Sequence, residues 1–195
     1  MQNMRSHLFF AAILLLAPAA TLAAGGTIKG KVDATPAKYL EETVVYVKQA
    51  HGSFKAKKEA VDQKGMKFIP RILTVTAGDT VDFLNHDGVD HNVFSPDNET
   101  FNLGMIKANA ASSYTFKSPG SYSLLCSIHP EMLGFIFVGQ NPFAAAVDAK
   151  GNFKIEHVPA GTYQLSIWNS HLKAAEQSIT VVEGKTAEAN FSLKR

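Results

Sequence analysis

Cysteine is almost absent from this chain, because Cys126 is the only one among 195 residues. A single cysteine cannot form a disulfide within the chain, so the fold does not depend on disulfide bonds. In an oxidising compartment an exposed free thiol would be a liability, and Cys126 would then be either buried and inert or bound to something. Its neighbours in the sequence decide between the two.

Net charge is small as well. Lys and Arg number 19 and Asp and Glu number 17, which gives a formal net charge of +2. The short group of Lys55, Lys57 and Lys58 is typical of a solvated loop. We therefore expect no nucleic-acid partner. The hydrophobic fraction of 46% is ample for a packed core, in one large domain or two small ones.

The N-terminus contains the longest hydrophobic run. Arg5 precedes an apolar stretch at 8–17, and Thr21-Leu22-Ala23 offers a site with small residues, which together are typical of a secretory signal peptide. The run is too short to span a bilayer comfortably, and an uncleaved membrane anchor is the alternative. We predict that residues 1–23 are removed and that the mature protein is periplasmic, with no membrane span.

A helical hydrophobic repeat is also missing, since no stretch after residue 23 keeps a 3.6-residue period over three turns. Alternation with period two recurs instead, so the sequence predicts an all-β fold. The strands are expected at 27–32, 43–48, 65–69, 72–76, 80–84, 112–117, 121–125 and 134–138, followed by a hairpin at 147–155 and further strands to the C-terminus. The residues between the His91 segment, 90–94, and the strand at 112 are expected to form a loop. Pro70 marks a break that belongs at a strand edge or bulge.

One stretch groups residues that bind metals. Cys126, His129 and Met132 follow one another at intervals of three, between two predicted strands, and His91 adds a second imidazole. Soft sulfur donors combined with imidazole suit copper, and two His, one Cys and a weak axial Met form the ligand set of a type I copper site. We predict that these four residues bind one copper ion per chain.

Other interpretations of the same residues are weaker. A buried, inert Cys126 beside ordinary His and Met residues would require several coincidences of type and spacing. Zinc is disfavoured as the native metal by the Met ligand. A binuclear copper centre would need a second Cys, and a multicopper enzyme would need His-x-His pairs, and the chain has neither. We therefore expect a protein that is not an enzyme.

The run from Lys64 to Gly139 resembles the cupredoxin family, in the branch that includes plastocyanin, pseudoazurin and amicyanin. The matching segments are Phe68-Ile69-Pro70, Ala77-Gly78-Asp79-Thr80-Val81, Asn85, His91-Asn92-Val93-Phe94, Pro119-Gly120-Ser121-Tyr122 and the loop with Cys126, His129 and Met132. The spacing in that loop is similar to that of amicyanin. The resemblance implies a Greek-key β-sandwich that carries one electron at a time between a protein donor and a protein acceptor.

The resemblance also implies roles for the residues around the ligands. Asn92 and Ser127 would tie the two ligand loops together. Electrons would pass through the edge of His129 within an apolar patch, for which the candidates are Leu103, Met105, Pro130 and Leu133. For Leu103 and Met105, ordinary packing is an equal alternative. Copper sequestration or delivery in the periplasm, without a dedicated redox partner, would use the same four ligands and is the alternative function.

The remaining residues resemble a second family. From Gly139 onward, especially at 148–153, 158–163 and 183–185, the chain is similar to the carboxypeptidase regulatory-like, or transthyretin-like, β-sandwich. Such domains begin with a Gly-x-Ile-x-Gly-x-Val strand and a Val-Tyr-Val strand, which here lie upstream at 26–32 and 44–47. We predict that residues 24–50 and 141–195 form one split sandwich with the cupredoxin, residues 51–140, inserted in it. The alternative makes 25–50 extra strands of the cupredoxin. The resemblance implies a binding or stabilising module.

Overall fold

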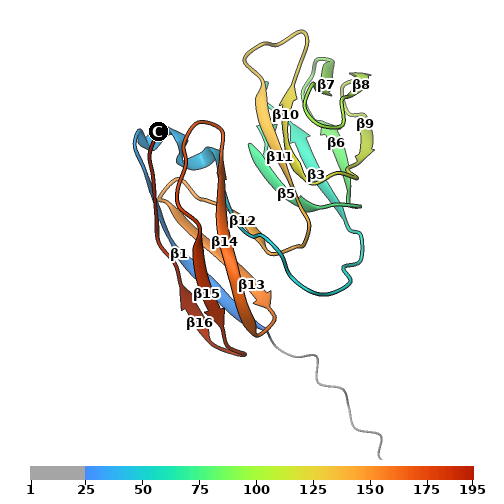
Figure 1. Cartoon of the computed structure of the whole chain (residues 1–195). Helices are drawn as coiled ribbons and strands as arrows, with labels where there is room; N and C mark the ends of the chain where they lie inside the picture. The colour runs from blue at the N-terminus through green and yellow to red at the C-terminus, as the bar shows by residue number, and fades with distance from the viewer. Residues whose placement is uncertain (1–24) are drawn as a thin grey trace, which may run out of the picture.

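In the computed structural model, which describes residues 25–195, nearly every element is a β-strand (Figure 1). The exception is a short 3-10 helix, η1 (Ala37–Glu42). The prediction of an all-β fold is therefore confirmed. The predicted signal peptide, residues 1–23, lies outside the described residues. No helix within residues 25–195 combines the length and apolar character needed to cross a membrane.

The middle of the chain forms a sandwich of two sheets, which we call the middle sandwich. One sheet has the order β5 (Ile72–Thr76), β11 (Leu133–Gly139), β10 (Gly120–Leu125), β7 (His91–Ser95) and β8 (Phe101–Ile106). The other has the order β4 (Phe68–Ile69), β3 (Lys58–Gln63), β6 (Thr80–Asn85) and β9 (Ala111–Thr115). Alternation along β10 explains the packing, because Tyr122 and Leu124 are buried in the core whereas Ser121 and Ser123 face outward.

The two ends of the described chain form another pair of sheets, which we call the outer sandwich. One sheet is built on β1 (Gly26–Ala34), which pairs with β13 (Asn152–Val158), β16 (Thr186–Glu188) and β17 (Phe191–Leu193). The other has the order β12 (Ala144–Ala146), β2 (Thr43–Val47), β14 (Gly161–Asn169) and β15 (Gln177–Val181). Among the described residues, β1 and β2 thus pair with strands that follow residue 139. Ile28, Val32 and Val45 of these two strands are fully buried in the outer core.

The two sandwiches pack against each other through aromatic side chains. The cluster contains Val44, Ile72, Phe135 and Phe137, with Tyr46, Leu133 and Trp168 against it. The rings of Phe135 and Trp168 lie 5.3 Å apart, and those of Tyr46 and Phe137 lie 4.7 Å apart. At the edge of this interface, Arg71 Nη2 donates to Glu42 Oε1 at 2.5 Å. The β5–β11 side of the middle sandwich is therefore fixed on the β2–β14 sheet of the outer sandwich (Figure 1).

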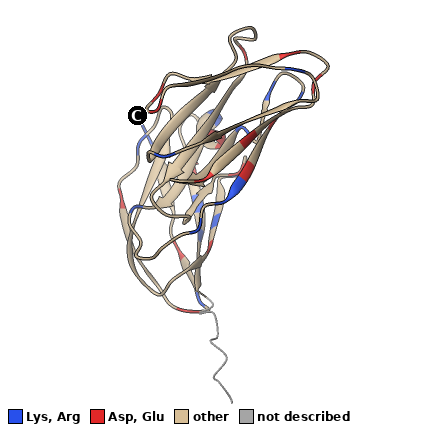
Figure 2. Cartoon of the chain, turned by 90° about the vertical axis from the view of Figure 1, so that its right-hand side faces the viewer, with Lys and Arg blue, Asp and Glu red and all other residues tan. Residues whose placement is uncertain are grey.

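Charged residues of both signs are interspersed along the chain (Figure 2). Several of them form surface pairs, including Lys48 with Glu176 at 2.7 Å and Lys107 with Asp90 at 2.6 Å. Such exposed pairs contribute about 0–1 kcal/mol each. The apolar clusters therefore decide the arrangement of the strands.

Three strand predictions were wrong in detail. β3 was not predicted, because its only buried side chains are Val61 and Gln63 and, apart from Ala60, the rest is charged. β8 was expected to be a loop, since Gly104, at φ 69°, interrupts its alternation. The strand expected at 65–69 shrinks to β4, because Gly65 and Met66 both adopt positive φ, at 62° and 54°. The break at Pro70, between β4 and β5, is confirmed.

Candidate metal centre

Strand pairing brings the two predicted ligand segments together. Leu125 at the end of β10 pairs with Leu133 at the start of β11, so residues 126–132 form a tight loop at one end of the middle sandwich. Leu125 also pairs with Phe94 of β7, which places the beginning of that strand beside the loop. Within the loop, the backbone N–H of Met132 donates to the carbonyl of His129 at 3.0 Å.

Three of the four predicted ligands converge. His91 Nδ1 and His129 Nδ1 lie 3.0 Å apart, and Cys126 Sγ lies 3.7 Å from His129 Nδ1. All three ligand atoms lie within 4.8 Å of one another. His91 is fully buried and Cys126 is nearly so, whereas His129 is partly exposed. The cluster thus has one imidazole in the protein interior and one at the surface.

Met132, the fourth predicted ligand, is 1% exposed. It packs in the same apolar cluster as Cys126, together with Val93 and Leu124. The thioether is therefore shielded from water in the same apolar cluster as the thiol. A soft, weakly coordinating sulfur in such a place suits an axial contact to copper.

Asn92 connects the two ligand segments through its backbone and its side chain. Its N–H donates to Cys126 Sγ at 3.4 Å, and its Oδ1 accepts the Ser127 N–H, also at 3.4 Å. The amide nitrogen donates to Asn102 Oδ1 at 2.8 Å and to the Gly104 carbonyl at 3.0 Å, so β8 holds the side chain in place. Ser127 takes part through its backbone, and its side chain is exposed. Its residue type therefore matters less than that of Asn92.

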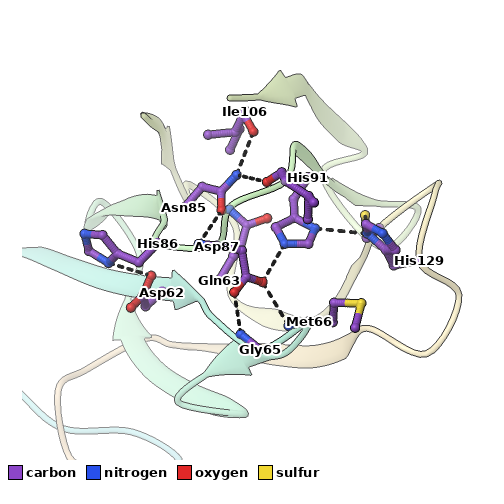
Figure 3. A network of polar contacts seen from close by, with 12 residues as sticks. Asp62, Gln63, Gly65, Met66, Asn85, His86, Asp87, His91, Ile106 and His129 are labelled. Carbon is purple, nitrogen blue, oxygen red and sulfur yellow. Dashed lines mark hydrogen bonds and ion pairs between the residues drawn. The ribbon is translucent and has the colours of Figure 1, made fainter. Parts of the chain in front are cut away.

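Asp87 was not singled out in the sequence, although it contacts His91 directly (Figure 3). Its Oδ2 lies 2.8 Å from His91 Nε2. The same carboxylate accepts the backbone N–H groups of Gly65 at 2.6 Å and Met66 at 2.9 Å. The hydrogen bond from Met66 is the largest influence on the pKa of Asp87, and together with the bonds from His91 and Gly65 it outweighs desolvation and lowers that pKa.

The Asp87 contact determines which nitrogen of His91 is free. An ionised carboxylate only accepts hydrogen bonds, so His91 Nε2 carries the proton and donates it. Nδ1 then has an unprotonated lone pair, directed at Cys126 and His129, as a metal ligand requires. The spacing of four residues between Asp87 and His91 was the only sequence signal, and carboxylates near histidines are too common for that signal to be specific.

The loop that carries Asp87 is itself held by Asn85 (Figure 3). The Asn85 amide nitrogen donates to the carbonyls of Val89 and Ile106, both at 2.9 Å. Its Oδ1 accepts the Asp87 N–H at 3.0 Å. Asn85 is fully buried, so these bonds are shielded from water and fix the path of the chain from β6 to His91.

Exposed apolar side chains gather in the segments around the cluster. Met66, Val89, Met105 and Ile128 are between 47% and 50% exposed. Met66 donates its N–H to Asp87, Val89 lies two residues before His91, Met105 pairs with Asn92, and Ile128 precedes His129. We call these four residues the apolar rim.

The predicted patch overlaps with this rim only in part. Met105 and Pro130 are exposed, as expected. Leu103 is half-buried against the middle core, and Leu133 is half-buried against the cluster that contains Phe135 and Trp168. Both side chains therefore keep part of their surface accessible, but less than Met105 and Pro130. Met66, Val89 and Ile128 were missed, because exposure cannot be read from single residues in a sequence.

The donor set fits copper. Two imidazoles and a thiol converge at one end of the middle sandwich, Met132 is buried in the same apolar cluster as the thiol, and the carboxylate of Asp87 binds the far nitrogen of His91. Harder ions such as Mg²⁺ and Ca²⁺ prefer oxygen ligands, which the cluster does not supply. Copper, with its preference for thiolate, thioether and imidazole, agrees best with these groups.

Comparisons with known proteins agree with this chemistry for part of the chain. Residues 55–139 match the family described as "Copper binding proteins, plastocyanin/azurin family". The amicyanin of Paracoccus versutus is 32% identical over 77 residues, which cover 37% of this chain and 58% of that protein. The chain therefore spans less than two thirds of the length of this relative. The cupredoxin resemblance of the middle segment is supported, and it is similar to amicyanin in particular.

Three solved structures illustrate the same likeness. A mutant amicyanin with Cu(I) is 32% identical, with a TM-score of 0.40, over 42% of this chain and 81% of that one. The Cu-containing nitrite reductase of Thermus scotoductus SA-01 is 28% identical, with a TM-score of 0.42, over 49% and 25%. The purple cupredoxin of Nitrosopumilus maritimus is 24% identical, with a TM-score of 0.38, over 44% and 100%.

The outer sandwich matched a different family from the one that its sequence resembles. Residues 139–189 match the family described as "Polysaccharide lyase family 4, domain II". The resemblance to carboxypeptidase regulatory-like domains is not confirmed. A β-sandwich is common to both descriptions of this part of the chain.

Proposed function

We propose that the middle sandwich binds one copper ion through His91, Cys126, His129 and Met132 and carries one electron at a time between a protein donor and a protein acceptor. The observation that carries this proposal is the convergence of His91, Cys126 and His129 within 4.8 Å. Copper would supply the redox change between Cu(I) and Cu(II). The similarity of residues 55–139 to plastocyanin/azurin-family proteins supports the same function.

The chain's own part in electron transfer is to hold the ligands still. The Asn92 N–H donates to Cys126 Sγ, and Asp87 binds His91 Nε2 at 2.8 Å, so hydrogen bonds hold both ligand side chains in place. The loop with His129 is closed by the pairing of Leu125 with Leu133. A site that moves little between two oxidation states exchanges electrons quickly, because little reorganisation accompanies the transfer.

The apolar rim would be the docking surface for redox partners. Its four exposed side chains lie in the segments next to the cluster, and His129 is the partly exposed member of that cluster. Small apolar contacts without strong charge pairing give weak, short-lived complexes, and electron-transfer partners use such complexes. Copper delivery without a redox partner is less well supported, because His91 and Cys126 are buried and an ion would have to leave past His129.

The domain limits and the location of the protein belong to the same proposal. Residues 24–50 and 141–195 would form one split domain around the cupredoxin, residues 51–140. The pairing of β1 and β2 with strands that follow residue 139 supports this division. The signal-peptide pattern at 1–23 supports export to the periplasm.

The direct test is a Cu(II) titration of the mature protein, followed by visible absorption and EPR. One equivalent should give an intense thiolate-to-copper band and a narrow copper hyperfine splitting, and ascorbate should bleach the band reversibly. Cys126→Ser should remove the band completely, because only a thiolate sulfur produces it. Ser127→Ala changes an exposed side chain next to it and should keep the band. A pale, ordinary Cu(II) spectrum from the wild type would overturn the proposal.

A further inference from the structure

The interface between the two sandwiches contains a groove. A hollow of about 560 Å³ lies where β10 and β11 of the middle sandwich face the end of β14. Its lining includes Trp168, Phe135, Asp97, Ser121, Ser123 and His171. A second hollow of about 370 Å³ lies next to it and shares the lining residues Ser121 and Trp168 with the first. Both volumes lie in the range of small-molecule sites, about 300–1,000 Å³.

The outer side of this groove is rigid. Trp168 packs against Phe135, with the ring centres 5.3 Å apart. The next residue, Asn169, connects two segments of the chain. Its amide nitrogen donates to the Tyr39 carbonyl at 2.8 Å, and its Oδ1 accepts the His171 N–H at 2.8 Å. The end of β14, with Trp168, and the turn after it, with His171, are therefore held in a fixed arrangement. Preformed walls of this kind reduce the entropy that a ligand must lose on binding.

The inner side of the groove carries small polar groups. Ser121 and Ser123 project from the outward face of β10, and Asp97 Oδ2 accepts the Ser123 N–H at 2.7 Å. Beside them, Asn98 has a φ of 43°, a turn conformation that asparagine adopts more readily than most residues. Gly120, next to Asn98, has a φ of 147°, a conformation that residues with a side chain rarely adopt, so a glycine is favoured there.

The character of these groups identifies a class of ligand. The larger hollow is lined by hydroxyls, amides, one carboxylate, one imidazole, an indole and the apolar side chains of Leu133 and Phe135, and no Lys or Arg among residues 25–195 lines it. A phosphate or another anion would need cationic partners, and a lipid would need a mostly apolar wall. An aromatic face beside side chains that can donate and accept hydrogen bonds suits a ligand with apolar C–H faces and many hydroxyls.

We propose that the groove binds a sugar residue of a glycan, with one sugar face on Trp168 and the hydroxyls on Asp97, Ser121 and Ser123. This binding would be a function of both sandwiches together, since neither supplies the indole and the carboxylate alone. It explains why the two sandwiches are fixed in one orientation by packing and by the Arg71–Glu42 pair. It requires no copper and stands independently of the proposed electron transfer.

The chain carries its own probe for this groove, because Trp168 is its single tryptophan. The experiment titrates the copper-free full chain with cellotetraose, xylotetraose, maltotetraose and the tetramer of N-acetylglucosamine, and follows Trp168 emission. At least one probe should give a saturable change with a dissociation constant on the order of 1 mM or tighter. Calorimetry with the same probe checks that the emission change reports binding.

Variants then test the assignment of the polar groups. Asp97→Asn and the double change of Ser121→Ala with Ser123→Ala should each weaken the binding at least tenfold, and Ser178→Ala, an exposed serine on β15, should leave it unchanged. The serine variant alters only exposed or half-exposed side chains and keeps the test valid if Asp97→Asn is poorly folded. No response to any probe, or equal binding by wild type and the serine variant, would overturn the proposal.

Discussion

The two sandwiches are alike in packing and differ in chemistry. Each encloses its own apolar cluster between two sheets of alternating strands. Among the described residues, the middle sandwich holds all the sulfur, in Cys126 and three Met residues, whereas the outer sandwich holds none. The sulfur and imidazole groups of the cluster meet at one end of the middle sandwich, where the loop 126–132 lies beside the start of β7. The comparison shows that the β-sandwich supplies the support and that a short loop grafted on it supplies the reactivity.

The sandwiches also differ in how the chain builds them. The middle sandwich comes from one continuous run, 58–139, whereas the outer one needs strands from both sides of that run. β1 lies at the centre of one outer sheet and β2 lies between β12 and β14 in the other. The outer sandwich therefore needs strands from both sides of the middle run, whereas the middle sandwich needs no strand of the outer one.

Cutting the chain into fragments should show this difference between the two sandwiches most strongly. A fragment of residues 51–140 should fold alone and bind copper, whereas 141–195 alone should not fold, because it lacks β1 and β2 and the buried side chains Ile28, Val32 and Val45. Circular dichroism during heating measures this as a cooperative transition for the first fragment and none for the second. Joining 141–195 through a flexible linker to 24–50 should restore cooperative melting. A cooperative transition of 141–195 by itself would contradict the split domain.

Removing the charge behind His91 should have the next largest effect. Asp87→Asn replaces a carboxylate that accepts two backbone N–H groups and the His91 ring. Changes to groups that orient a metal-binding His lower metal affinity about 10–100-fold, and we expect a loss in that range, measured by competition with a copper chelator.

Asp62→Asn is the matched control for Asp87→Asn. Asp62 also binds a histidine, with its Oδ1 2.9 Å from His86 Nδ1, but that pair is at the surface and away from His129 (Figure 3). Copper affinity should change less than about twofold in this variant. Equal losses in the two variants would mean that Asp87 acts through general electrostatics and not through His91.

A change at the axial position should be smaller. Met132→Leu keeps a buried apolar side chain of similar volume in the cluster with Cys126, so the fold should tolerate it. Without the thioether, Cu(II) loses a donor, and the reduction potential should rise by on the order of 60 mV, which is a tenfold change in relative affinity for the two oxidation states. Cyclic voltammetry measures it. An unchanged potential would show that Met132 does not contact the metal.

The sequence was sufficient for the features that depend on residue type and spacing. His91, Cys126 and His129 could be identified because soft donors at fixed intervals are rare by chance, and β10 could be identified because Tyr122 and Leu124 alternate with serines. The pairing of β1 with β13 agrees with a glycine-rich strand pattern far upstream of its partners.

Other features depended on contacts that a sequence does not reveal. β3 was missed because its polar residues hide the alternation of Val61 and Gln63. Asp87 was missed because its role comes from the left-handed turn at Gly65 and Met66, which directs two N–H groups at its carboxylate. The interface between the sandwiches could not be predicted either, because Phe135 and Trp168 lie far apart in the chain and each is an ordinary strand residue.

The junction of the two sandwiches should show the smallest effect, and it should depend on pH. Burial raises the pKa of Glu42, but hydrogen bonds from Ser170 and Arg71, with the charge of Arg71, outweigh it and leave the pKa below the ordinary value of 4.5. A lowered pKa stabilises the fold above the unfolded-state value, and this contribution is lost as the pH falls through the folded-state pKa.

Glu42→Gln should therefore cost about 1 kcal/mol of unfolding free energy at pH 7, and the difference from wild type should shrink below pH 4.5. Urea unfolding followed by Trp168 emission measures it, because Trp168 lies in the same interface. Other acidic groups titrate in both proteins and cancel in the difference. A difference that stays constant down to pH 3 would show that Glu42 acts through packing alone, and the two sandwiches would then be joined by their apolar surfaces without help from the charged pair.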